Sequence, residues 1–171
     1  QVTRFKKDGE QYDVIVQVAP RTVSFDKGAE HIVGLRLSPK GLHRWYADCC
    51  KTPLGNTMTP ALPFVGIGVD ALRATGQEPQ REQLFGKVRA GVLGQFATGG
   101  APPGSTKLPW RMMAHVVRLM LGWKLGGGAW PHPFFDRASG GPSHPVTVLS
   151  RAARDALRPK CGTNPTGVAA S

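Results

Sequence analysis

Short runs rich in β-branched and aromatic residues, separated by turn residues, dominate the first half of the chain. Apolar and polar side chains alternate most clearly at 31–37, as they do in a half-buried strand. Tight turns such as the Ser-Pro-Lys-Gly sequence at 38–41 follow these runs, so the strands between residues 12 and 47 are expected to form an antiparallel meander. The segment 52–57 is expected to be a loop. The predicted strands are 12–18, 22–25, 31–37, 42–47 and 64–69.

The second half of the chain contains one segment with clear helical periodicity. Ser105 or Thr106 is expected to cap this helix, and the three glycines at 126–128 are expected to end it. A second, short helix is expected to start after Ser150, its cap, and to reach Leu157. Six apolar side chains share one face of the first helix, which is therefore amphipathic: Leu108, Met112, Val116, Leu119, Met120 and Trp123.

Glycine and proline are abundant, with 22 Gly and 15 Pro among 171 residues. This composition favours long irregular loops. One of them, the aromatic and proline-rich segment 130–145, is expected to pack back over the sheet, and 84–96 fits either a strand pair or a glycine-interrupted helix. The predicted fold class is mainly β with C-terminal helices (α+β). The predicted organisation is a β domain at 1–98, a helical and loop extension packed on it at 99–158, and a disordered tail at 159–171.

The chain is strongly basic. It has 22 Lys and Arg against 11 Asp and Glu, for a formal net charge of +11. Such a surface attracts polyanions, so RNA, an anionic membrane or an acidic partner subunit are candidate partners. The basic residues are scattered, which equally fits a solvated surface. No membrane span is predicted, because charged residues interrupt the most apolar stretch, 108–125, and the charged N-terminal sequence predicts no secretory leader.

The chain has three cysteines: Cys49 and Cys50, which are adjacent, and Cys161 near the end. Neighbouring cysteines rarely pair, because the disulfide would strain the peptide between them. An odd count also fits poorly with a secreted disulfide framework. A reducing intracellular compartment is therefore predicted, either the cytoplasm or an organelle matrix.

The most informative segment is Arg-Trp-Tyr-Ala-Asp-Cys-Cys-Lys-Thr-Pro-Leu-Gly-Asn at 44–56. It resembles the aromatic-Cys-x-x-Cys-Gly-Thr-Pro-Leu motif of the glutathione-dependent formaldehyde-activating enzyme and centromere protein V (GFA/CENP-V) family. On that pattern Cys50 is the second cysteine, Ala47 stands at the first, and Lys51 stands at the glycine. The likeness to an uncharacterised subgroup of this family extends to 16–20, 36–42, 63–66, 133–136 and 148–158.

The resemblance implies a β-tent fold, in which antiparallel sheets meet near a zinc site. It also implies carbon–sulfur lyase activity on a glutathione adduct, with zinc as the Lewis acid. Cys49 and Cys50 are then the candidate zinc ligands. The upstream cysteine motifs of the family do not occur in this sequence, so the other ligands are expected from preceding residues, His43 or a partner, with Cys161 a further candidate. The alternative is a vestigial pair with one cysteine buried as a small apolar side chain.

Three basic residues, Arg36, Lys40 and Arg44, could point into one cleft and hold an anion, although separate solvated strand charges explain them as well. No catalytic residue is assigned, because no nucleophile–base signature or carboxylate pair occurs. The remaining candidates are given structural interpretations. The histidines are expected on the surface or in loops (His31, His43, His115, His132, His144), and the methionines and tryptophans are expected to pack (Met112, Met113, Met120, Trp110, Trp123, Trp130).

Two functions remain open from the sequence. The first is a zinc-binding protein related to the formaldehyde-activating family, or one with a degenerate zinc site and lost lyase activity. The second is a basic structural subunit of a larger assembly that contains protein partners and RNA. The positive charge, the apolar helix and the long loops favour a protein that packs against partners.

Overall fold

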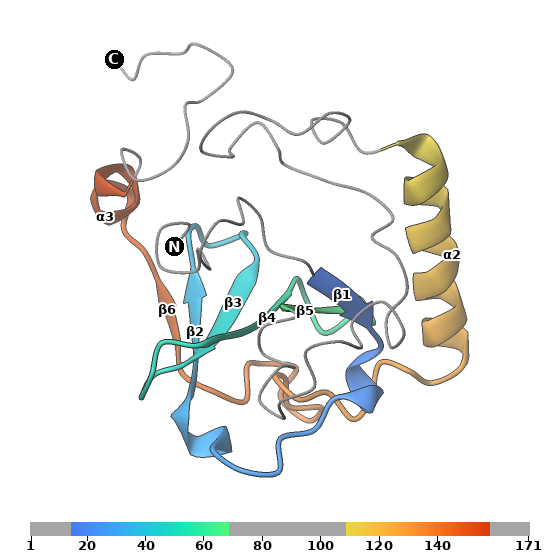
Figure 1. Ribbon diagram of the computed structural model, residues 1–171, viewed down its shortest axis with the longest axis horizontal. Coiled ribbons are helices and arrows are strands. Elements are labelled where there is room, and N and C mark those ends of the chain that lie inside the picture. Colours follow the sequence, from blue (N-terminus) through green and yellow to red (C-terminus); the bar gives the residue numbers. More distant parts are fainter. Residues whose placement is uncertain (1–14, 69–108, 158–171) are drawn as a thin grey trace, which may run out of the picture.

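The computed structural model describes residues 15–68 and 109–157, which form one six-stranded mixed sheet with two helices (Figure 1). The strand order is β1-β5-β4-β3-β2-β6. Strands β2 to β5 form an antiparallel meander, of which only the β2–β3 pairing was predicted. Strand β1 pairs antiparallel with β5, and β6 pairs parallel with β2. The mainly β fold class is confirmed. The strands are β1 (Ile15–Val18), β2 (Ile32–Arg36), β3 (His43–Ala47), β4 (Pro53–Thr57), β5 (Val65–Gly68) and β6 (Val146–Val148).

Two strand predictions differ from the structure. Residues 52–57 were expected to form a loop, but β4 occupies 53–57 and lies between β3 and β5. Pro53 is the first residue of β4, a position where its missing N–H costs little. The predicted strand at 22–25 is wrong, because a 3-10 turn covers Pro20–Thr22 and 23–25 has no strand partner. The predictions for 12–14, 69–108 and 158–171 lie outside the described residues.

The core lies on one face of the sheet. Trp45 of β3 is 1% exposed, and its indole stacks on Phe134 with ring centroids 4.8 Å apart. The Trp45 Nε1–H donates to Thr57 Oγ1 at 2.8 Å. Gly34 of β2 lies over the indole, where a Cβ would come within 2.8 Å of Trp45 Cζ3, so only glycine fits. The buried apolar residues are Ile32, Trp45, Val65, Ile67, Phe134 and Phe135.

The segment after the long helix completes this core, as predicted for the loop at 130–145. Phe134 and Phe135 come from that loop, and β6 extends the same sheet. The expected β domain at 1–98 and extension at 99–158 therefore share one hydrophobic core in the described residues.

The long helix, α2 (Trp110–Leu125), lies beside the sheet (Figure 1). The predicted apolar face is the less exposed side of α2, since Met112, Val116, Leu119, Met120 and Trp123 are half-buried, but none of them belongs to the core cluster. Trp110 and Met113, which were expected to pack, are exposed. The C-terminal end is held to the 3-10 turn that follows β1, because the Arg21 Nη1–H donates to the Gly126 carbonyl at 3.1 Å.

The short helix α3 (Arg151–Ala156) begins as predicted. The Ser150 Oγ accepts a hydrogen bond from the Ala153 N–H at 3.1 Å, which is an N-cap. Within 15–68 and 109–157, neither helix combines the length and the apolar character that crossing a membrane requires.

Candidate functional site

The cysteine pair lies in the turn that joins β3 to β4. Cys49 and Cys50 are both exposed, so the expectation of one buried cysteine is wrong. The turn closes at Lys51, which has the left-handed φ of 58°, and the Lys51 ammonium pairs with the Asp48 carboxylate. The two thiols therefore face solvent on a turn fixed at both ends by paired strands.

The two thiols differ in acidity. The Thr52 hydroxyl lies 3.0 Å from the Cys50 Sγ, and hydrogen bonds from Thr52 lower the pKa of Cys50. The pKa of Cys49 is raised, chiefly because its thiol hydrogen-bonds to Cys50. The pair therefore loses its first proton from Cys50, and a thiolate is the form that attacks electrophiles and binds metals.

Two thiolates are half of a tetrahedral zinc ligand set. In the described part of the chain, no three His, Cys, Asp or Glu residues gather where they could hold a metal. His43 begins β3 and the cysteines follow its other end, which lies about 13 Å from His43 along the strand. The His43 Nδ1–H also donates to the Met58 carbonyl at 3.0 Å, so His43 does not join the pair. Cys161 lies outside the described residues.

The three candidate anion-binding residues do not converge. Leu35 pairs with Arg44 across β2 and β3, so Arg44 shares the face of Leu35 and Arg36 projects from the opposite face. The Arg36 Nε–H donates to the Gly41 carbonyl at 3.1 Å, and an Arg44 Nη1–H donates to the Leu42 carbonyl at 3.3 Å. Lys40 is exposed in the turn between the strands. The geometry fits separate charges rather than one cleft.

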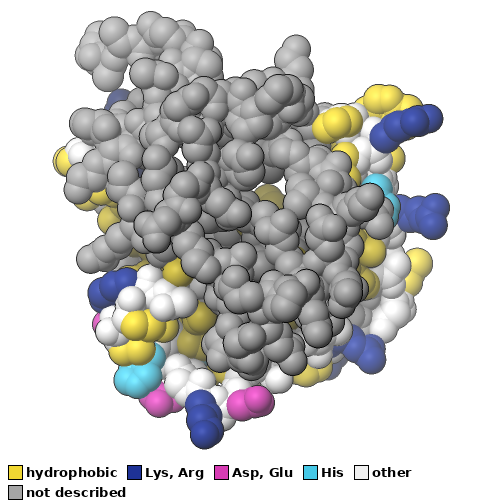
Figure 2. Space-filling view, in the orientation of Figure 1, with side chains coloured by type: hydrophobic (Ala, Val, Ile, Leu, Met, Phe, Trp, Pro, Cys, Tyr) yellow, Lys and Arg dark blue, Asp and Glu magenta, His cyan; other side chains and the backbone are white. Residues whose placement is uncertain are grey.

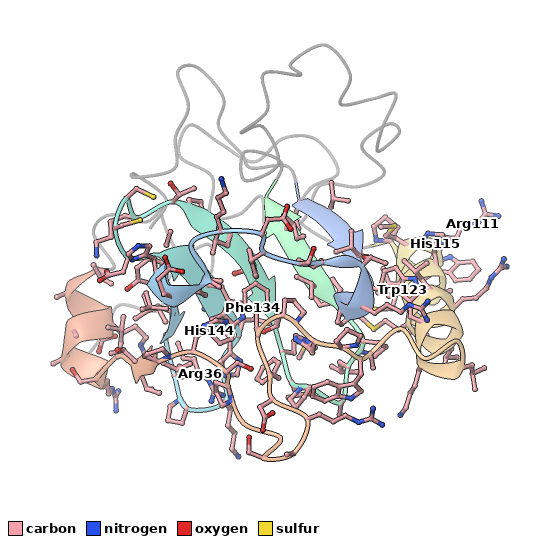
Figure 3. All side chains as sticks on the ribbon, turned by 90° about the horizontal axis from the view of Figure 1, so that it is seen from below. Arg36, Arg111, His115, Trp123, Phe134 and His144 are labelled. Atoms are coloured by element: carbon pink, nitrogen blue, oxygen red, sulfur yellow. The ribbon has the colours of Figure 1, made fainter. Side chains whose placement is uncertain are left out.

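A cluster of histidines and aromatic rings, which the sequence analysis missed, lies on the core side of the sheet. His43 stacks on Trp45 with centroids 5.4 Å apart, and His132 meets the edge of Phe135 at 4.8 Å. His43 is buried in β3, so the expectation of a surface or loop position is wrong for it. His132 lies in the predicted loop but is buried, and His31 and His115 are exposed. Figure 3 shows Phe134, His144 and Arg36 together on this side of the sheet.

A pocket opens beside this cluster, with a volume of about 380 Å³. His132 lies in its wall and is 7% exposed, and its Nδ1 accepts a hydrogen bond from the Phe134 N–H at 3.1 Å. That bond assigns the ring proton to Nε2. Burial lowers the pKa of His132 to about 4, so the ring is neutral at pH 7. The pocket is lined by Trp130, Pro131, His132, Phe135, Asp136, Arg137 and Ser143.

The model of one protein family matches residues 3–147. The chain belongs to DUF6151, a family of unknown function. No curated protein and no solved structure shows significant similarity to the chain.

The DUF6151 match contains strands β1 to β5, most of β6, the cysteine turn and the pocket. Both candidate sites are thus part of the DUF6151 domain itself. The cysteine pair was visible in the sequence as an unusual dipeptide. The pocket had a weaker signal, the Trp-Pro-His-Pro-Phe-Phe run at 130–135, which places polarizable rings and a titratable group in a proline-stiffened loop.

Proposed function

We propose that this DUF6151 protein binds zinc through Cys49 and Cys50, as a relative of the formaldehyde-activating and centromere protein V family with a β-tent fold. The observation that carries the proposal is the pair of exposed thiols, of which Cys50 has its pKa lowered by hydrogen bonds from Thr52. Soft thiolate ligands favour zinc over the hard cations. The segment at 44–56, with its Thr-Pro-Leu after the cysteines, supports the relationship.

The proposal requires two more ligands from outside the described residues, from a second copy or from a partner. A reducing compartment, the cytoplasm or an organelle matrix, would keep both thiols available. Carbon–sulfur lyase activity on a glutathione adduct would depend on those added ligands leaving one position of the zinc open to substrate. The two thiolates alone would bind the metal without supplying that activity.

Protein prepared without chelators from its natural source is expected to contain about one zinc per chain, or one per two chains if a second copy completes the site. Elemental mass spectrometry measures this ratio. The C49S/C50S double variant should lose the metal. Thr52→Val, the matched control, should keep the stoichiometry but move half-maximal binding to higher pH, because the Cys50 thiolate loses its hydroxyl donor.

Two results would contradict zinc binding at this turn. One is wild-type protein free of zinc. The other is equal zinc content in the wild type and the C49S/C50S variant.

An alternative function, a basic subunit of a larger assembly, is favoured by α2. Its outer stripe consists of Trp110, Met113, Val117, Leu121 and Leu125, which lie on one side of a helix with 3.6 residues per turn and are 48% to 89% exposed. The helix also carries Arg111, Arg118 and Lys124 and no carboxylate. Figure 2 shows hydrophobic and basic side chains together on this side of the molecule, and in Figure 3 Arg111 projects away from the sheet.

The chemistry of this stripe points to an acidic protein segment with apolar side chains as the partner. A second copy of α2 would bring only positive charges together, and RNA would leave the apolar stripe unused. The apolar side chains supply the buried area, and the three cations select a partner of opposite charge.

Binding to two synthetic amphipathic helices tests this alternative. Both present leucine on one face, and glutamate flanks it in one peptide and lysine in the other. Fluorescence anisotropy should show that only the glutamate peptide binds. The V117E/L121E variant should bind this peptide at least about tenfold more weakly, and the R151E variant, changed on α3, should bind it as the wild type does. Equal binding of the lysine peptide would refute the assignment. Salt-sensitive RNA binding that V117E/L121E does not change would favour nucleic acid instead.

A further inference from the structure

The pocket beside His132 has the composition of a small-molecule site, and the zinc proposal makes no use of it. Its volume of about 380 Å³ falls at the lower end of the range for ligand pockets. Trp130, Pro131 and Phe135 supply flat apolar walls, and Asp136, Arg137 and Ser143 supply polar groups. Such a combination of apolar walls and a few polar groups is typical of a site that orients one small ligand.

The imidazole of His132 lies in the wall of this pocket and carries a buried donor that no described group satisfies. Its Nδ1 is occupied by the Phe134 N–H, and its Nε2 has no hydrogen-bond partner although the residue is only 7% exposed. A buried donor without an acceptor destabilises the fold, so such groups are rare unless a ligand or water satisfies them. A ligand atom that reaches Nε2 when the ring shifts toward the pocket would supply this acceptor, as a water molecule would.

The charges of the pocket select the kind of acceptor. The Asp136 carboxylate already accepts hydrogen bonds from the Ser139 N–H and Oγ–H, each at 2.8 Å, which lower its pKa and hold it within its own turn. Arg137 forms no ion pair with any described residue, and its guanidinium is a planar donor suited to a carboxylate. Donors therefore outnumber free acceptors in this pocket.

We propose that this pocket binds a small organic carboxylate with a flat apolar body. One carboxylate oxygen accepts the His132 Nε2–H, the Arg137 guanidinium neutralises the charge, and the body lies against Trp130 and Phe135. Because the neutral imidazole donates only through Nε2, the site favours ligands that place an acceptor atom at Nε2 over ligands that place a donor there. The cysteine turn takes no part, so this site and the zinc site can be tested separately.

Benzoate is the probe, with benzamide as its neutral analogue and benzylamine as its cationic one. Titration followed by ¹⁵N NMR should show saturable shifts of the His132 Nε2 and Trp130 Nε1 resonances with benzoate. Benzamide should bind at least about tenfold more weakly, since a charge-assisted hydrogen bond is lost. His132→Asn should weaken benzoate binding about tenfold, because asparagine can keep the acceptor for the Phe134 N–H but lacks the imidazole Nε2–H.

Arg137→Gln should remove the preference for benzoate over benzamide, and Arg151→Gln on α3 should change nothing. The Trp45 indole resonance reports the fold in each variant, because its N–H is bonded in the core. Absence of a saturable shift at millimolar benzoate, tighter binding of benzylamine, or undiminished binding by the folded His132→Asn protein would each overturn the proposal.

Discussion

Replacing Trp45 with alanine should lower the free energy of unfolding by about 3–5 kcal/mol. The side chain is almost fully buried and stacks between His43 and Phe134, at centroid distances of 5.4 and 4.8 Å. Its removal would leave a cavity at the centre of the only core that the described residues form, and it would leave the Thr57 hydroxyl without its indole partner. Urea denaturation followed by circular dichroism measures the change.

Trp110→Ala is the matched control for this experiment. It deletes the same side chain from the surface of α2, where Trp110 is 75% exposed, so the expected change is within about 0.5 kcal/mol. Trp45→Phe should lower the free energy of unfolding by an intermediate amount, about 1–3 kcal/mol. It keeps a ring in the stack but leaves Thr57 Oγ1 unpaired. A Trp45→Ala protein as stable as Trp110→Ala would show that the stacked rings do not hold the sheet and loop together.

Acidification should destabilise the fold between pH 6.5 and about 4 through His132. Burial lowers the folded-state pKa of this imidazole from 6.5 to about 4, so in this range the unfolded chain takes up a proton that the folded protein excludes. Stability is therefore complete above pH 6.5 and falls as the pH drops. The expected loss is about 2 kcal/mol, smaller than the full shift implies because solvent in the open pocket screens the charge.

His132→Asn should remove most of this pH dependence while leaving the stability at pH 7.5 within about 1.5 kcal/mol, because the acceptor for the Phe134 N–H can be retained. A weaker dependence of stability on pH should persist because of His43, whose pKa is lowered by burial and, to a smaller extent, by the Arg36 charge. Urea midpoints measured at several pH values give the slope. An unchanged slope in His132→Asn would refute the role of His132.

Bound carboxylate should stabilise the folded protein. A carboxylate that accepts the Nε2–H keeps a proton on that nitrogen, raises the pKa of His132 and binds only the folded state. Excess benzoate at pH 7.5 should therefore raise the urea midpoint of the wild type, and raise that of His132→Asn by less, because the variant binds benzoate about tenfold more weakly.

The sequence by itself determined the elements whose signal is local. Alternating apolar residues predicted the described parts of β1, β2, β3 and β5, helical spacing predicted the packed face of α2, and Ser150 predicted the start of α3. These patterns work because side-chain direction repeats every 2 residues in a strand and every 3.6 in a helix. The cysteine pair was equally visible, because its interest lies in residue type rather than position.

Only the tertiary structure decided the features that depend on distant partners. Strand β4 is poor in strand-forming residues, and it is extended because β3 and β5 pair with it on both sides. Strand β6 joins β2 across more than half of the chain, a pairing that no local pattern encodes. The same holds for the burial of His132 against Phe135 and the exposure of Trp110, since a side chain's environment is set by what packs over it and not by its own hydrophobicity.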